Sequence, residues 1–119
     1  MSYKYPIKGL LSIVSATIIL SFSATAFAAD DDGAEFKAIL KKNDCFKCHA
    51  IDKTKKGPSY KKIAAKYKGK EAEGETKMIK NITTGPKVKL EDGTEEEHKV
   101  IDIKDPQELK KLVHWILSL

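Results

Sequence analysis

The chain is 119 residues long and carries 22 lysines, no arginine and 17 acidic residues, for a formal net charge of +5 at pH 7. This length allows one small domain, and the excess of positive charge is too mild to indicate a nucleic-acid-binding protein. Only two cysteines are present, so any cysteine chemistry is confined to a single pair.

The N-terminal residues have the three parts of an export signal. Two lysines form a basic start, residues 10–20 are mostly apolar, and Ala26-Phe27-Ala28 is a small-x-small cleavage site. The apolar run is shorter than the roughly 20 residues of a membrane-spanning helix, so cleavage is favoured over a retained anchor. We expect a signal peptide at 1–28 and one mature domain at 29–119, with a net charge of +3 and no membrane span.

The first predicted helix follows the acidic run at residues 30–32. Phe36, Ile39 and Leu40 recur at the i, i+3, i+4 spacing of an amphipathic helix, which is expected to end near Asn43. Acidic residues before its first turn suit the positive end of the helix dipole. The helix therefore leads directly into the only two cysteines.

The segment Cys45-Phe46-Lys47-Cys48-His49 has the C-x-x-C-H spacing that is typical of covalent haem attachment. Thioether bonds from Cys45 and Cys48 would anchor the haem, and His49 would lie under the iron as its proximal ligand. A structural zinc site is disfavoured because it normally needs four protein ligands and no second cysteine pair exists. A thioredoxin-like dithiol is disfavoured because the motif follows a helical pattern rather than a strand.

Two further helical patterns follow the motif. The second predicted helix begins at Pro58, a residue suited to a first helical position, and ends at Gly69. Its apolar face consists of Tyr60, Ile63, Ala64 and Tyr67. The third pattern is weaker and is stopped by Gly85-Pro86. Its apolar residues are Met78, Ile79 and Ile82.

Residues 86–104 show no helical period. Val88 and Leu90 alternate with lysines and Asp92-Gly93 is a turn dipeptide, which together favour a short hairpin. Three consecutive glutamates at 95–97 then precede His98.

The last helix is the clearest of the four. Asp105 is expected as its N-cap, Pro106 lies in its first turn, and Glu108 completes a pattern like a capping box. Its apolar stripe consists of Leu109, Leu112, Val113 and Ile116.

These features resemble the class I c-type cytochromes of the small bacterial periplasmic kind, over essentially the whole mature chain. The resemblance is carried by the motif Cys45–His49 with its preceding helix, Ala50-Ile51-Asp52, Gly57-Pro58-Ser59-Tyr60, and Leu112–Leu119 with Trp115. It implies a periplasmic protein with an all-α fold, in which about four helices surround one covalently bound haem c per chain. An irregular or short-hairpin loop would cover the distal side.

The resemblance also implies roles for individual residues. The carbonyl of Pro58 would accept a hydrogen bond from the ring N–H of His49 and so orient the imidazole. The N- and C-terminal helices would cross with Phe36, Leu40 and Trp115 in their contact, and Trp115 would pack at the haem pocket.

The distal iron ligand departs from the family pattern. A methionine usually binds the iron from this side, but His98 stands near the expected position and the loop contains no methionine. We expect His98 to be the distal ligand, with Met78 as the alternative. An open site, or one held by Lys87, Lys89 or Lys99, is the remaining possibility. His114 lies off the apolar stripe of the last helix and is expected to face solvent.

The resemblance implies an electron carrier rather than an enzyme, and two imidazole ligands would give it a lower potential than its methionine-ligated relatives. Nine lysines and a single acid lie between Cys45 and Lys70, so the haem edge is expected to attract acidic redox partners. Alternative functions are binding or reduction of a small ligand at a displaceable distal site, and a haem subunit of a larger redox complex. The sequence does not indicate an oligomeric state.

Overall fold

The structure, a computed structural model, describes Gly9 and residues 33–119. The expected signal peptide at 1–28 and its cleavage site therefore lie outside the described residues, apart from Gly9. Within 33–119, none of the helices combines the length and the apolar character needed to cross a membrane.

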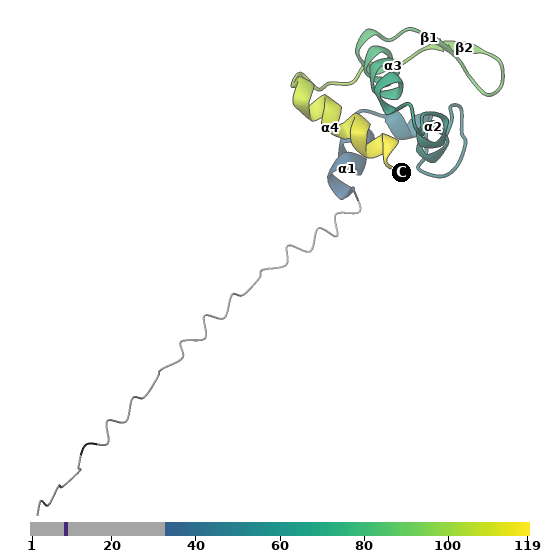
Figure 1. The fold of residues 1–119 in the computed structure, drawn as a ribbon. Helices are drawn as coiled ribbons and strands as arrows, with labels where there is room; N and C mark the ends of the chain where they lie inside the picture. Colours follow the sequence, from purple (N-terminus) through teal and green to yellow (C-terminus); the bar gives the residue numbers. More distant parts are fainter. Residues whose placement is uncertain (1–8, 10–32) are drawn as a thin grey trace, which may run out of the picture.

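The described chain folds into four α-helices, one short 3-10 helix and one hairpin (Figure 1). In chain order these are α1 (Ala34–Lys42), η1 (Cys45–Lys47), α2 (Tyr60–Lys66), α3 (Glu71–Thr84), β1 (Lys87–Lys89), β2 (Glu95–Glu97) and α4 (Pro106–Leu117). The expected all-α class, with about four helices and a short hairpin, is confirmed.

Helix α4 supplies the centre of the core and packs against both α2 and α3. It begins as expected, because Asp105 is its N-cap and the Oδ1 atom of Asp105 accepts a hydrogen bond from the Gln107 amide at 2.8 Å. Its buried residues are Leu109, Leu112, Val113 and Ile116, which is the stripe that the sequence predicts.

Helices α1 and α4 meet through aromatic stacking. The rings of Phe36 and Trp115 lie 5.3 Å apart between centroids, with 25° between their planes. Leu40, one turn after Phe36, is 2% exposed in the same core. Gly33 comes immediately before α1 in the left-handed conformation, and its Cα lies against the Trp115 ring.

The second helix begins later than the sequence pattern predicts. Ser59 is its N-cap, with Oγ accepting from the Lys62 amide at 3.1 Å, so the helix starts at Tyr60 and not at Pro58. The early amides of this turn donate to earlier loop carbonyls, from Tyr60 to Ala50 and from Lys61 to Ile51. Pro58 is thereby left outside the helix, which ends at Lys66, before Gly69.

The hairpin follows α3, which ends at the expected Gly85 in the left-handed conformation. Two of its three residue pairs place a lysine opposite a glutamate: Lys87 faces Glu97 and Lys89 faces Glu95. Opposite charges directly across an antiparallel pair stabilise it, which explains how so polar a sequence forms strands. At the tip, the Asp92 carboxylate accepts from the Thr94 amide at 2.9 Å.

An exposed cluster joins α3 to α4. The Glu75 carboxylate lies 2.5 Å from His114 Nε2 and 3.3 Å from Lys110 Nζ. Hydrogen bonds from His114 and Lys110 lower the pKa of Glu75. His114 is exposed, as its place off the apolar stripe predicts.

Replacement of Gly33 by alanine should destabilise the fold. The added Cβ would lie 2.2 Å from Trp115 Nε1, and φ of +75° is unfavourable for any residue with a Cβ. We expect a loss of about 2–4 kcal/mol in the free energy of unfolding, measured by urea denaturation followed by circular dichroism.

Gly69→Ala is the matched control, because its φ is +76° but nothing lies within 4 Å of its added Cβ. It should lose only the conformational part, about 1–2 kcal/mol. Equal losses for the two variants would show that contact with Trp115 contributes nothing.

Candidate functional site

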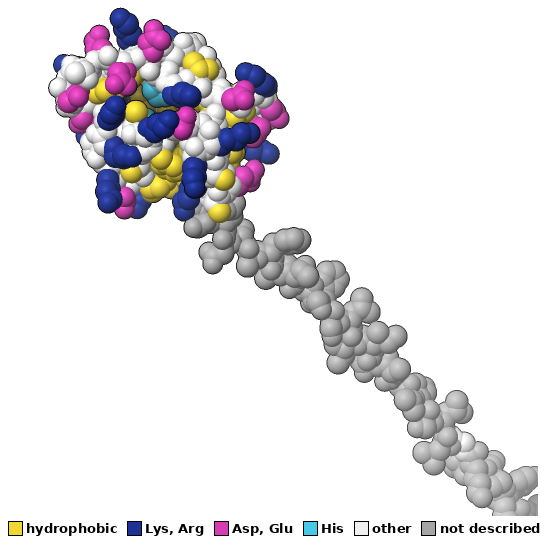
Figure 2. Space-filling view, turned by 180° about the vertical axis from the view of Figure 1, so that it is seen from behind, with side chains coloured by type: hydrophobic (Ala, Val, Ile, Leu, Met, Phe, Trp, Pro, Cys, Tyr) yellow, Lys and Arg dark blue, Asp and Glu magenta, His cyan; other side chains and the backbone are white. Residues whose placement is uncertain are grey.

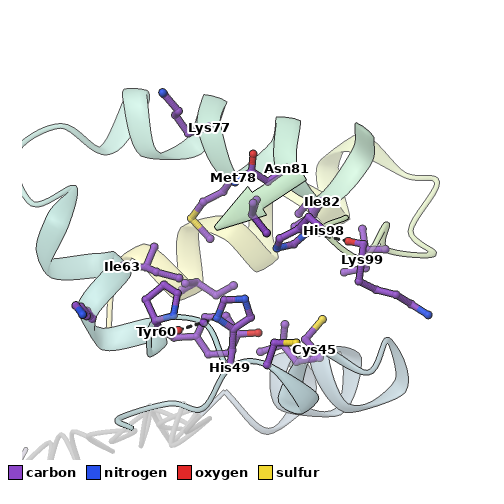
Figure 3. A pocket seen from close by; sticks show the side chains of 18 of the residues that line it. Cys45, His49, Tyr60, Ile63, Lys77, Met78, Asn81, Ile82, His98 and Lys99 are labelled. Carbon is purple, nitrogen blue, oxygen red and sulfur yellow. Dashed lines mark hydrogen bonds between the residues drawn. The ribbon is translucent and has the colours of Figure 1, made fainter. Parts of the chain in front are cut away.

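A cavity of about 640 Å³ opens between two halves of the molecule (Figure 3). One wall is formed by the segment Cys45–His49 and by α2, and the other by α3, the hairpin and the residues after it. Much of the lining is apolar, with side chains such as Leu40, Ile63, Ile82, Ile101 and Leu112. In the space-filling view a histidine lies in a hollow among hydrophobic and lysine side chains (Figure 2).

The local backbone brings both cysteines and His49 to one wall. Helix α1 ends at Lys42, and Asp44 then adopts a left-handed φ of 60°, which turns the chain into the 3-10 helix η1. The His49 amide donates to the Cys45 carbonyl at 3.0 Å, closing a single turn. Cys45, Cys48 and His49 therefore all line the cavity. Burial raises the pKa of the Cys45 thiol.

The His49 imidazole is held from three directions. Its Nδ1 atom lies 2.7 Å from the Pro58 carbonyl oxygen, its ring stacks on Tyr60 at 5.2 Å between centroids, and Gly57 lies beside its Cε1 atom. A carbonyl can only accept a hydrogen bond, so Nδ1 carries the proton and Nε2 keeps its lone pair. Burial lowers the pKa of His49, which favours the neutral ring that can bind a metal.

His98 lies across the cavity from His49 (Figure 3). The two ring centroids are 6.1 Å apart and the ring planes are inclined by 44°. A metal bound to one nitrogen of each ring, at about 2 Å per bond, would hold the ring centres about 6 Å apart. The Nδ1 atom of His98 lies 3.0 Å from the Lys99 carbonyl, which leaves Nε2 as the second free nitrogen.

The other candidate ligands occupy different positions. Met78 projects from α3 towards the cavity and also packs against the core. Lys89 and Lys99 line the cavity, whereas Lys87 is exposed on β1. His114 is bound to Glu75 on the outside of the bundle.

Trp115 lies in the contact between α1 and α4, stacked on Phe36. Among the described residues, those of α4 that line the cavity are Leu112 and Ile116, and Trp115 is not one of them. Its ring turns towards α1, where it stacks on Phe36.

Sequence reasoning assigned no role in the site to two residues that shape it. Gly57 is one, because an alanine Cβ there would lie 2.9 Å from His49 Cε1. Asn43 is the other: it is 7% exposed, and its side chain links the Ile39 carbonyl to the Asp102 amide. A signal for Asn43 does exist, since it lies seven residues after Phe36 and thus on the apolar face of α1.

The residues present fit a haem. The cavity volume lies within the range of protein cofactor sites, its walls are largely apolar, and two free thiols stand beside an imidazole with an available nitrogen. Within 33–119, no cluster of three or more His, Cys, Asp or Glu side chains is arranged to hold a metal ion.

Comparison with known proteins agrees with this arrangement. The family model described as cytochrome c matches residues 34–119. Cytochrome c-551 of Pseudomonas denitrificans is 32% identical over 81 residues, covering 68% of this chain and 93% of that protein. Cytochrome c-551 of Pseudomonas aeruginosa is 41% identical over 69 residues, covering 56% and 65% of the two chains.

Solved structures give the same result at the level of the fold. The class 1 cytochrome MtoD from Sideroxydans lithotrophicus ES-1 is 52% identical, with a TM-score of 0.66 over 73% of this chain and 95% of that one. Wild-type cytochrome c552 of Nitrosomonas europaea is 30% identical, with a TM-score of 0.55 over 70% and 98%. The chain therefore belongs to the cytochrome c family, as a small class I electron carrier with one haem c covalently attached through its cysteine pair.

Proposed function

We propose that the protein is a periplasmic monohaem carrier of single electrons, with its haem bound to Cys45 and Cys48 and its iron between His49 and His98. The mature domain would comprise residues 29–119 after removal of the signal peptide. The observation that carries the proposal is the pair of imidazoles that face each other across the cavity at 6.1 Å. When bound, the haem supplies a one-electron couple between ferric and ferrous iron.

The proximal side is supported by the contacts of His49. The hydrogen bond to Pro58 fixes the ring tautomer and makes Nε2 a stronger donor. Stacking on Tyr60 and the close approach of Gly57 limit rotation of the ring. A ligand held in one orientation would need little reorganisation on electron transfer.

We assign His98 rather than Met78 as the distal ligand, on two observations about His98 and one about Met78. The His98 ring lies at a ligand's distance from the His49 ring, and its Nδ1 contact with the Lys99 carbonyl leaves Nε2 free for the metal. Met78, by contrast, lies within helix α3, and its side chain packs against the hydrophobic core. Two imidazoles stabilise ferric iron relative to an imidazole and a thioether, so the potential is expected to be lower than that of methionine-ligated relatives.

The rim of the cavity supports a docking role. Its exposed lysines come from α2, α3, β1 and the segment after β2, and they are Lys62, Lys66, Lys77, Lys89 and Lys99. Glutamates of the hairpin lie among them, with Glu96 3.7 Å from Lys56 and Glu91 3.8 Å from Lys62. Lys66 and Lys77 have no ion-pair partner among the residues that the structure describes, and they would draw an acidic redox protein towards the haem edge.

Removal of both cysteines tests the cofactor's part in the fold. In a Cys45→Ala, Cys48→Ala variant, which cannot retain covalent haem, the cavity of about 640 Å³ would be left without its filling. A small domain is stable by only about 5–15 kcal/mol, so losing the contacts of a haem with this apolar lining removes a large part of that margin. We expect loss of cooperative thermal unfolding in circular dichroism. A haem-free chain that still unfolds in one sharp transition would contradict this.

Replacement of His98 tests the distal ligand. The ferric protein should show low-spin, bis-imidazole signals in low-temperature electron paramagnetic resonance and near-infrared magnetic circular dichroism, and His98→Ala should lose them. His98→Met should raise the potential by at least about 60 mV, a tenfold change in the one-electron equilibrium. His114→Ala is the control and should change neither property. A high-spin native spectrum would sink the assignment and favour a ligand-binding haem protein.

Neutralisation of rim lysines tests the docking surface. A Lys66→Gln, Lys77→Gln variant should be oxidised by the anionic reagent ferricyanide about threefold more slowly at low salt. The difference should vanish near 1 M salt, where the Debye length is about 3 Å. Lys42→Gln, Lys111→Gln removes the same charge from exposed sites of α1 and α4 and should have a smaller effect. Equal effects of the two pairs would mean that only net charge matters.

A further inference from the structure

The segment that follows β2 and contains His98 is fastened to the rest of the molecule by three backbone amides. The His98 amide donates to the Pro86 carbonyl at 2.9 Å, and the Ile101 amide donates to the Ile82 carbonyl at 2.8 Å. Both of these acceptors lie at or just beyond the end of α3. The third amide, that of Asp102, donates to Asn43 Oδ1 at 2.8 Å and so crosses to the end of α1, 59 residues away.

Asn43 is suited to this role because both ends of its side-chain amide are used. Its Nδ2 atom donates to the Ile39 carbonyl at 3.0 Å, which fixes the rotamer, while Oδ1 accepts from Asp102. The residue is 7% exposed, so a lost partner could not readily be replaced by water. Asn43 also lies two residues before Cys45, and the contact therefore connects the haem-attachment motif to the opposite wall of the cavity.

The other links between the two walls are weaker. Three ion pairs cross between the walls, Lys99–Asp44 at 3.8 Å, Lys56–Glu96 at 3.7 Å and Lys62–Glu91 at 3.8 Å, and all of their side chains are largely exposed. Exposed ion pairs contribute little and are screened by salt. A backbone bond from the Glu91 amide to the Lys56 carbonyl, 2.9 Å long, fastens the hairpin but lies at its far end, near the turn.

We propose that Asn43 is a positioning residue for His98. By holding the Asp102 amide it keeps the segment closed over the cavity, and this sets how often the distal imidazole moves away and lets an external ligand enter. The inference rests on the proposed distal role of His98. Its direct consequence is that Asn43, at the end of α1, controls the entry of an external ligand, although none of its atoms would touch the iron.

The test measures the rate at which added cyanide binds to the ferric holoprotein, followed by the change in its visible spectrum; cyanide is chosen because replacing one imidazole ligand by free imidazole would leave the spectrum almost unchanged. Asn43→Leu keeps the approximate shape and removes both hydrogen bonds, and should raise this rate roughly tenfold. Asn43→Asp keeps an oxygen that can accept from Asp102, and its rate should lie closer to that of the native protein. Equal acceleration by both variants, or by neither, would overturn the proposal.

A control separates positioning from a general loss of stability. Val113 is fully buried on α4 and is not a lining residue of the cavity, so Val113→Ala should destabilise the fold while leaving the rate of cyanide binding within about twofold of the native value. If Val113→Ala accelerates entry as much as Asn43→Leu, global unfolding controls entry and the proposal fails.

Two further measurements cover the remaining outcomes. Hydrogen exchange on the native holoprotein needs no variant: the Asp102 amide should exchange at least about a hundredfold more slowly than an unprotected amide, and unprotected exchange would overturn the proposal.

His98→Ala separates this proposal from the assignment of the ligand. If that variant keeps the native spectrum, the distal assignment fails; if it loses the spectrum while Asn43→Leu binds cyanide at the native rate, only the role of Asn43 fails.

Discussion

The hydrogen bond between His49 and the Pro58 carbonyl is the contact on which the site depends. It fixes which ring nitrogen carries the proton, and it requires the chain to return to the motif nine residues later. That return brings Gly57 against the imidazole, where any side chain would collide with Cε1. Because the Pro58 carbonyl points at His49, the second helix begins only at Tyr60, whose ring then stacks on the imidazole.

The parts of the fold that sequence reasoning predicted are those set by local rules. The N-cap Asp105, the stripe of α4 and the glycine that ends α3 follow from periodicity and capping over a few residues. The predicted start of α2 was wrong because it depends on a contact that local rules do not contain. Pro58 has the right local preference for a first helical position, but its carbonyl is used by a residue outside the helix, and propensity does not contain that contact.

In the candidate site, the same division separates the two walls of the cavity. The spacing of Cys45, Cys48 and His49 is a local property. It could be read directly from the sequence, and it also predicts that His49 lies on the proximal side of the haem. The position of His98 depends on bonds to Pro86, on residues of α3 and on Asn43, which are separated from it by 12 to 55 positions in the chain. No pattern within a short window describes them, and the register of His98 came from resemblance to a family.

This difference in sequence separation has a physical consequence for how the two candidate ligands are supported. The contacts of His49 close a loop of nine residues, whereas those of the segment around His98 require α1, α3 and the hairpin to be packed together first. Closing long loops costs more chain entropy, and contacts that form late are among the first to open. The proximal imidazole is therefore fixed by the motif's own surroundings, and the freedom that remains at the iron lies with His98. The exposed ion pair between Lys99 and Asp44 restrains the segment around His98 only slightly, which leaves the buried side-chain amide of Asn43 as the strongest side-chain link across the cavity.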